Sequence, residues 1–289
     1  MSSIVSRNLK IYFRDKSAVF FSLLGILITV GLYFLFLGDT YTDGLADFNH
    51  PEIFMAGWIM SGLLSITSVT TTMGAFGTMV QDKEKKIYKD FYCSPIKRST
   101  LTMGYIISSA VVGLIMTAVV LVITVVYLAA NEAIVISAML VVKMILLSAL
   151  TSLSNTAMAL FIVSLINSEK AFSAISGVMS ALIGFLTGIY IPVGNLDEGV
   201  QMVVKCFPTS HSAVLFRQIL MENSLNEGVK SYPAAAQAEA LAEVKDVLGV
   251  VFKFGETECS AEMSLLILVG ALVVFSSLSI FTLNRKKTA

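Results

Sequence analysis

The stretch LTMGYIISSAVVGLIMTAVVLVITVVYLAAN, residues 101–131, carries no charged side chain, and it decides the class of the protein. A helix needs about 20 predominantly apolar residues to cross a hydrocarbon layer about 30 Å thick. The chain of 289 residues is 56% hydrophobic and only 14% charged. This composition is too apolar for one water-soluble core, so the sequence predicts an all-α polytopic membrane protein.

Further uncharged runs of similar length lie on both sides of this stretch. The six predicted membrane helices cover residues 18–37, 53–80, 101–131, 144–168, 171–196 and 263–284. The first run is expected to be a membrane helix and not a cleaved signal peptide, because no small-residue cleavage pattern follows it. The second run is rich in Gly, Ser and Thr, which allow close helix contacts, so we expect it at the centre of the bundle.

Basic residues are distributed unequally along the chain. Residues 1–17, 81–100, 167–170 and 284–289 together hold fourteen of the 20 Lys and Arg residues but only five of the 20 Asp and Glu residues. By the positive-inside rule these segments are cytoplasmic. The sequence therefore predicts a multi-pass cell-membrane protein with both termini in the cytoplasm.

Four regions follow from this topology. Residues 1–17 precede the first span, residues 18–196 hold five spans, residues 197–262 are extracellular, and residues 263–289 form the last span and a basic tail. In the extracellular region, two short amphipathic helices divided at Phe207-Pro208 are expected to insert partly into the outer leaflet. A further amphipathic helix is expected before the last span.

Residues 1–17 have the pattern of an amphipathic helix. Apolar side chains recur at helical spacing, at Val5, Leu9, Tyr12 and Phe13, and basic side chains occupy another face, at Arg7, Lys10 and Arg14. One interpretation is an interfacial helix that lies on lipid of the inner leaflet. The alternative is a basic flank that only fixes the topology.

The segment QDKEKKIYKDFYCSPIKRST, residues 81–100, is densely charged between two apolar runs. In a helix, Tyr88, Phe91 and Tyr92 lie on one face, and Lys85, Lys86, Lys89 and Asp90 cover the remainder. Pro95 disfavours a helical conformation at Ser94, so the helix is expected to end there. A cytoplasmic helix over 81–95 is typical of a docking element for another protein, and the alternative is a basic loop without a partner.

The sequence gives no sign of catalytic or metal-binding chemistry. His50 and His211 are isolated, and the chain has no Walker-type glycine loop, HExxH motif or CxxC motif. No Asp or Glu falls within an apolar run, which disfavours an ion-coupled carrier. We therefore expect a chain that is not an enzyme, binds no cofactor and no metal, and has no nucleic-acid partner.

Three other residues leave alternatives open. Cys206 and Cys259 are both predicted to be extracellular, where they either pair or stay free. Lys143 lies just before the fourth run, where its ammonium group either reaches the outer surface or faces a polar cavity.

Two motifs resemble those of the permease subunits of type-2 ABC exporters, the ABC-2 membrane family. The segment DKEKKIYKDFYCSPIKRS is similar to the family pattern E-K-x-x-G-T-x-E-x-L-x-x-S-P through Glu84, Ser94 and Pro95, although Lys86-Ile87 stand near the Gly-Thr positions. The segment YIPVGNLDEGVQMVVKCFPTSHSAVLFRQIL resembles the family's re-entrant outer hairpin. That match runs through Pro192, Pro208, Ala213 and Arg217.

The resemblance implies a permease that pairs with itself or with a similar subunit, as a homodimer or a heterodimer. It implies two copies of a separate nucleotide-binding ATPase, which bind ATP and Mg and dock on a helix over 81–95. The docking residues expected from it are Glu84, Lys85, Ile87, Tyr88, Phe91, Tyr92, Ser94 and Pro95. The implied path lies at the subunit interface, lined by the second and fifth spans.

The function implied is export of an amphiphilic cargo such as a drug, an antimicrobial peptide or a lipid-linked molecule. Two alternatives stay open at this point. One is a membrane anchor or sensor subunit that transports nothing, and the other is an ion-coupled secondary carrier.

Overall fold

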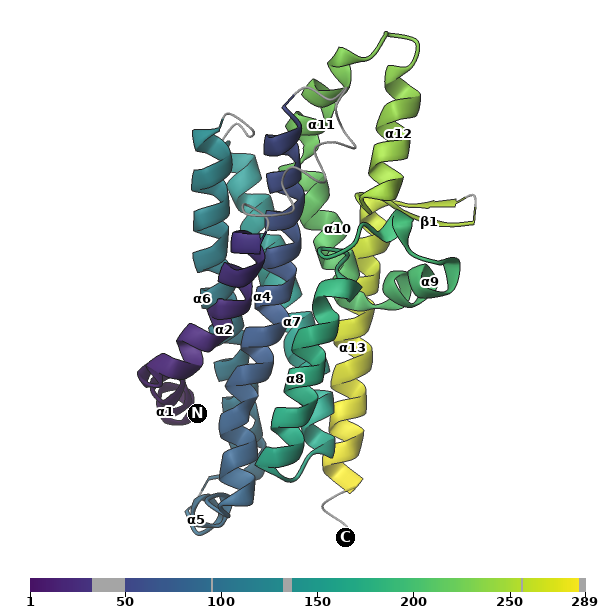
Figure 1. Cartoon of the computed structure of the whole chain (residues 1–289). Coiled ribbons are helices and arrows are strands. Elements are labelled where there is room, and N and C mark those ends of the chain that lie inside the picture. Colours follow the sequence, from purple (N-terminus) through teal and green to yellow (C-terminus); the bar gives the residue numbers. More distant parts are fainter. Residues whose placement is uncertain (33–49, 95, 132–136, 256, 286–289) are drawn as a thin grey trace.

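The computed structural model describes residues 1–32, 50–94, 96–131, 137–255 and 257–285. Long helices run side by side in an elongated bundle, namely α4 (Pro51–Glu84), α6 (Arg98–Ala130), α7 (Ala138–Leu165), α8 (Glu169–Leu186) and α13 (Ala261–Arg285) (Figure 1). These 5 helices are long and apolar enough to cross a membrane. The chain is therefore a multi-pass helical membrane protein, as predicted.

Two helices precede the bundle. The helix α1 (Ser2–Arg14) is followed by the single residue Asp15 and then by α2 (Lys16–Leu32). The first predicted span, 18–37, begins within α2, and its remainder lies outside the described residues. Toward one end of the bundle lie α5 (Tyr88–Tyr92) and the end of α13, and toward the other lie α11 (Glu222–Gly228) and α12 (Gln237–Val247) (Figure 1).

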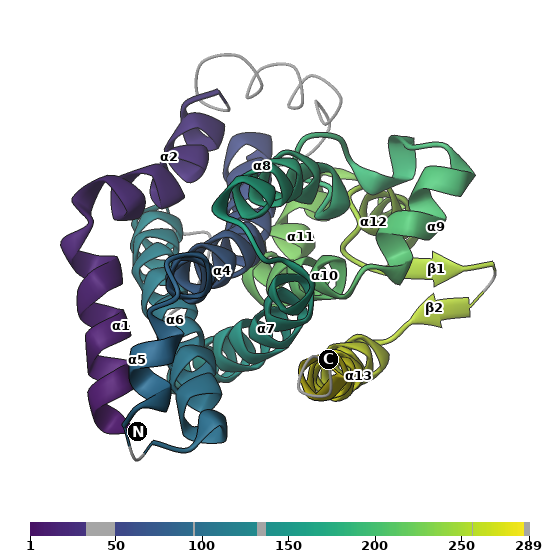
Figure 2. The same ribbon diagram turned by 90° about the horizontal axis from the view of Figure 1, so that it is seen from below.

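The helix α4 lies at the centre, with α6, α7, α8 and α10 (Pro208–Leu220) around it (Figure 2). Every residue from Phe54 to Ser65 is buried. Its hydroxyl groups are tolerated there because they donate to carbonyl oxygens one turn earlier, as Thr67 does to Leu63 at 2.7 Å and Thr71 does to Thr67 at 2.6 Å. The predicted central position of the second span is confirmed.

Helix ends differ from the predicted runs in two places. The fourth span begins at Ala138, so Lys143 lies within α7 and not before it. The fifth ends at Leu186 and not at residue 196, because Gly188 has a left-handed φ of +69° that a helix does not accommodate. A short 3₁₀ turn, η2 (Val193–Asn195), then follows Pro192.

The segment between α8 and α13, which was predicted to be extracellular, folds into small elements packed on the bundle. They are α9 (Glu198–Cys206), α10 (Pro208–Leu220), α11 (Glu222–Gly228), η3 (Val229–Ser231), α12 (Gln237–Val247) and an antiparallel pair of strands, β1 (Phe252–Phe254) and β2 (Thr257–Cys259). The strand pair is an addition to the all-helical prediction. Cys206 is exposed, Cys259 is buried, and both are free thiols.

The predicted break at Phe207-Pro208 is confirmed, since Phe207 is extended and Pro208 begins α10. The two helices it separates are unlike each other. Val203 of α9 is 61% exposed, whereas α10 packs against α4, α7 and α13 and buries polar residues such as His211 as well as apolar ones. The amphipathic interpretation was therefore wrong for α10, because both of its faces meet other helices.

Candidate coupling site at the α5 end

The predicted helix over 81–95 is divided by the structure. Residues Gln81–Glu84 continue α4, and the backbone then turns at Lys86, whose φ of +59° interrupts the helix. The separate helix α5 comprises only Tyr88–Tyr92. A single docking helix over 81–95 was therefore wrong, because a left-handed residue cannot propagate helical hydrogen bonds.

The predicted docking residues fall on three pieces of chain. Glu84 ends α4 and Lys85 follows it, Ile87 immediately precedes α5, Tyr88, Phe91 and Tyr92 belong to α5, and Ser94 follows α5. Ser94 donates its hydroxyl to the carbonyl of Phe91 at 2.7 Å, which closes the end of α5. Pro95 lies outside the described residues.

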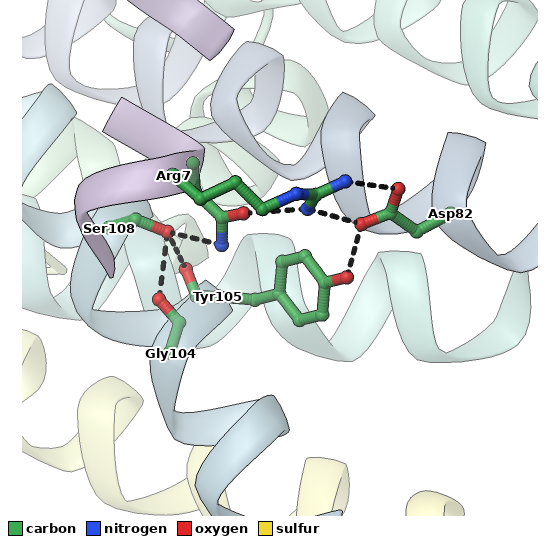
Figure 3. Close-up of polar contacts among 6 residues, drawn as sticks. Arg7, Asp82, Gly104, Tyr105 and Ser108 are labelled. Carbon is green, nitrogen blue, oxygen red and sulfur yellow. Dashed lines mark hydrogen bonds and ion pairs between the residues drawn. The ribbon is translucent and has the colours of Figure 1, made fainter. Parts of the chain in front are cut away.

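An ion pair joins α1 to the end of α4. Arg7 donates from Nη1 to Oδ2 of Asp82 at 2.6 Å and from Nη2 to Oδ1 at 2.8 Å (Figure 3). The hydroxyl of Tyr105 on α6 also donates to Oδ2 of Asp82. The side chain of Asp82 is 4% exposed and that of Arg7 is 31% exposed. This bidentate contact is the strongest ion-pair geometry available to a guanidinium group. Hydrogen bonding to Asp82 raises the pKa of Arg7.

The same guanidinium group reaches α5. Its carbon lies 5.4 Å from the centre of the Phe91 ring, within the range of a cation–π contact. Phe91 also packs on a buried apolar cluster that includes Val80 of α4 and Leu101 of α6. One face of α5 is thus held against the bundle, and Lys89 and Asp90 are exposed.

The helix α1 packs closely on α6. Its buried residues are Ile4, Asn8 and Tyr12, which share one face. The amide of Asn8 donates to the hydroxyl of Ser108 at 3.2 Å (Figure 3). A Cβ atom at Gly104 would lie 2.5 Å from Cγ2 of Ile4. Glycine at this position is what lets the two helices approach.

The amphipathic character of α1 is confirmed, but its faces are divided differently from the prediction. Arg7 points toward Asp82, whereas Lys10 and Arg14 are exposed. Tyr12 donates its hydroxyl to Ser22 of α2 at 3.3 Å, and burial raises the pKa of Tyr12. The position of α1 on lipid stays a prediction.

Glu84 is engaged within the protein. Its Oε2 accepts the backbone N–H of Glu169 at 2.6 Å, at the start of α8, where Ser168 accepts the N–H of Ala171 at 3.2 Å. A carboxylate is favourable at a helix N-terminus because free N–H groups and the helix dipole meet it there. Glu84 therefore connects the end of α4 to α8, and its role in docking stays a prediction.

Sequence reasoning identified Arg7 and Phe91 but not their partner Asp82. The available signal was position, because Asp82 is the first acidic residue after the long uncharged run 53–80. Its burial needed the contacts of α1 and α6, which the sequence pattern does not reveal. Among the described residues no group of three or more His, Cys, Asp or Glu is placed to hold a metal ion.

The second set of predicted residues lies away from this site, near the other end of α4. Pro192 is buried just before η2, Pro208 begins α10, and Ala213 and Arg217 are buried on α10. Arg217 donates to the carbonyl of Thr187 at 2.8 Å and to that of Gly249 at 3.2 Å.

The guanidinium of Arg217 also lies 5.1 Å from the ring centre of Trp58. The indole N–H of Trp58 in turn donates to the carbonyl of Leu248 at 2.8 Å. Arg217 therefore joins α4, the end of α8 and the turn before β1, which is a structural role that the sequence pattern did not define.

Comparison with known proteins agrees with this arrangement. The family described as ABC-2 family transporter protein matches residues 38–281, which include α4 to α12 and most of α13 but neither α1 nor α2. No curated protein matches the chain. Members of this family generally work with a separate nucleotide-binding ATPase subunit. The chain belongs to the ABC-2 family of transporters and is a membrane permease subunit of an ABC transporter.

Proposed function

We propose that this permease exports an amphiphilic cargo across the cell membrane, and that two copies of a separate ATPase, with ATP and Mg, drive it from the cytoplasm. The observation that carries the proposal is the contact of one guanidinium group, that of Arg7, with both Asp82 of α4 and Phe91 of α5. Movement of α5 is transmitted through this group to α1 and α4. Coupling of this kind is a rigid-body shift that needs no chemistry in the permease itself.

The proposed docking surface is the outward side of α5 and the turn before it. Its exposed charged residues are Lys85, Lys86, Lys89 and Asp90. Ile87 and Tyr88 are half-buried beside them. Because Phe91 holds one side of α5 against the bundle, the opposite, charged side keeps a fixed orientation toward a partner. A fixed orientation allows movement of the partner to displace α5 and the helices in contact with it.

The proposed cargo path follows α8 and not α4. The helix α4 is buried within its own chain, so the earlier expectation that the second span lines the path is replaced. The exposed surface of α8 mixes apolar residues, Ile175, Val178 and Leu182, with small or hydroxyl residues, Ser173, Gly177 and Ser180. Such a surface suits a cargo that has both apolar and polar parts.

The same face of α8 suits a second permease subunit, identical or similar to this one. Small residues let membrane helices approach closely, and a Cβ atom at Gly177 would meet no atom within 4 Å. Gly270 of α13 is equally exposed and equally free of neighbours, but apolar residues such as Leu266 and Val273 surround it. We expect Gly177→Trp to lower the dimer fraction in chemical cross-linking and the matched Gly270→Trp to leave it unchanged. Equal loss in both variants contradicts the α8 interface.

Docking is tested by reversing a charge on α5. Lys89→Glu is expected to reduce co-purification of the ATPase, whereas Lys230→Glu, on the outer segment, makes the same charge change without effect. Both variants should insert in the membrane to the same level. Undiminished co-purification and ATP-driven export in Lys89→Glu rule out α5 as the docking surface.

Transport itself is tested in proteoliposomes that contain the permease and the ATPase. Export is expected to require ATP and to survive an ionophore. An ion-coupled carrier gives the reverse result, and a sensor or anchor subunit binds the ATPase but moves no cargo.

A further inference from the structure

A cavity of about 680 Å³ opens between the start of α7, the end of α10, α11 and the end of α12. The elements that form it meet toward the α11 and α12 end of the molecule, away from α5 (Figure 1). This volume falls within the range of small-molecule binding sites. The cavity takes no part in the coupling site or in the proposed path along α8.

Two lysines that line the cavity have no carboxylate partner among the described residues. Lys143 of α7 and Lys245 of α12 come from distant parts of the chain, and neither forms an ion pair with any described residue. The neighbouring Lys253, by contrast, pairs with Asp246 at 3.3 Å. Glu222 also lines the cavity, but in the described part of the chain it pairs with neither lysine. The cavity wall therefore carries a net positive charge that an anion would neutralise.

The remaining wall combines hydrogen-bonding and apolar groups. The side-chain amides of Gln218 and Asn223 line the cavity, and Gln218 is held in place by donating to the carbonyl of Val250 at 2.9 Å. Leu140 and Ile219 supply apolar surface. Ammonium and amide groups donate to an anion with several oxygen atoms, and the apolar residues accommodate a hydrocarbon chain.

The position of Lys143 indicates where such an anion would come from. Lys143 lies near the start of α7, a membrane-spanning helix, where a lysine extends to the level of lipid head groups. Lys143 is exposed and also lines the cavity, so it faces a cavity as one alternative expected, and its reach to the outer surface stays a prediction. A cavity beside a lysine in this position is expected at the level of the lipid head groups.

We propose that this cavity binds a phosphate-bearing amphiphile, an anionic phospholipid whose phosphate meets Lys143 and Lys245 and whose hydrocarbon lies over Leu140 and Ile219. The site is separate from ATPase docking and from the cargo, so it does not rest on the proposed function. Binding ties α7 to α12 and is expected to stabilise the outer segment on the bundle.

The test uses the purified full-length permease in detergent at low ionic strength, where screening of lysine charges is least. The probes are short-chain phosphatidylglycerol, short-chain phosphatidylcholine and inorganic phosphate, with binding followed by thermal shift and by native mass spectrometry. Lys143→Gln/Lys245→Gln is expected to weaken binding of phosphatidylglycerol at least about tenfold. The matched control Lys230→Gln/Lys253→Gln removes the same charge from lysines outside the cavity and is expected to bind as the wild type does.

The variant Lys143→Arg/Lys245→Arg changes the same two side chains but keeps both positive charges, and it is expected to retain binding. It therefore separates loss of charge from a defect in folding. A lysine-dependent shift with phosphatidylglycerol but not with inorganic phosphate supports a lipid. The same shift with inorganic phosphate alone supports a phosphate site filled from solution. The proposal is overturned if phosphatidylcholine binds as well as phosphatidylglycerol, if neither phosphatidylglycerol nor inorganic phosphate binds, or if Lys143→Gln/Lys245→Gln binds normally.

Discussion

Replacement of Asp82 by asparagine removes the charge that holds α1 against α4 while keeping the shape of the side chain. In the protein the carboxylate accepts two N–H groups of Arg7, at 2.6 and 2.8 Å, and the hydroxyl of Tyr105. Asparagine offers one oxygen in place of two and turns an N–H₂ group toward the guanidinium. The variant therefore weakens the contact between Arg7 of α1 and position 82 of α4 without creating a cavity.

The magnitude follows from the exposure of the two partners. Removing one partner of a buried ion pair costs about 3 to 5 kcal/mol because the other charge is left without compensation. Here Arg7 is 31% exposed and regains water, and asparagine keeps one acceptor, so about 2 kcal/mol is expected for Asp82→Asn. This energy corresponds to about a thirtyfold shift toward detached α1.

Detachment is measured by the reactivity of a cysteine placed at Ile4, which is 5% exposed against α6. The exposed native thiols of Cys93 and Cys206 are first replaced by serine. With Asp82→Asn, the labelling rate of the cysteine at position 4 is expected to rise about thirtyfold, in proportion to the detached fraction.

Lys10→Gln is the matched control, because it removes the charge of an exposed basic residue of α1 that forms no ion pair with Asp82. Arg7→Gln is expected to increase labelling at least as much as Asp82→Asn, and the double variant less than the sum of the two. An unchanged labelling rate in Asp82→Asn would refute the reasoning, since α1 would then be held by Asn8, Tyr12 and apolar contacts alone.

Three further changes test other parts of the structure. Gly104→Ala places a Cβ atom 2.5 Å from Cγ2 of Ile4, so it is expected to displace α1 and to increase labelling, measured with a cysteine at another buried position of that helix. Burial lowers the pKa of His211, so the folded protein binds a proton less readily than the unfolded chain. Stability is therefore expected to fall as the pH drops below about 6.5, measured by melting temperature between about pH 7.5 and about pH 5.5. Arg217→Met leaves two buried carbonyl groups without a donor and is expected to cost about 3 kcal/mol, measured by denaturation in detergent.

Each of these has a control and a contrary outcome. Gly270→Ala places its Cβ atom in open space and is expected to be neutral, so an equal effect there would show that the Gly104 result is not due to contact with α1. His211→Gln is expected to flatten the pH dependence, and a dependence that persists would assign it to another group. Arg217→Lys keeps the positive charge but loses the planar guanidinium group. A lysine variant as stable as the wild type would therefore argue against simultaneous hydrogen bonds to the carbonyls of Thr187 and Gly249.

Much of the helical framework could be predicted because its signals are local. The run 101–131 corresponds to α6, which spans Arg98–Ala130, and the run 263–284 corresponds to α13, which spans Ala261–Arg285. The break before Pro208 was also predicted correctly, since proline acts on the conformation of its immediate neighbours. Hydropathy and proline chemistry act over a few residues, so a linear sequence reveals them.

The candidate site was predicted in composition but not in arrangement. Basic α1 and the aromatic residues of α5 were recognised, but the left-handed turn at Lys86 was not, because lysine has no particular preference for that conformation. The burial of both faces of α10 was missed for a related reason. A short helix with one apolar stripe resembles a surface helix until its neighbours are known.

The sequence by itself determined that this chain crosses a membrane several times, which of its segments are basic, and where the helices α4, α6 and α13 begin and end to within a few residues. Only the tertiary structure decided that the guanidinium group of Arg7 binds Asp82, 75 positions away, and also contacts the ring of Phe91. It also decided that Lys143 and Lys245 face one cavity. The physical reason is range, because apolar runs and charge bias depend on neighbours along the chain, whereas ion pairs and cavities depend on how separate helices pack.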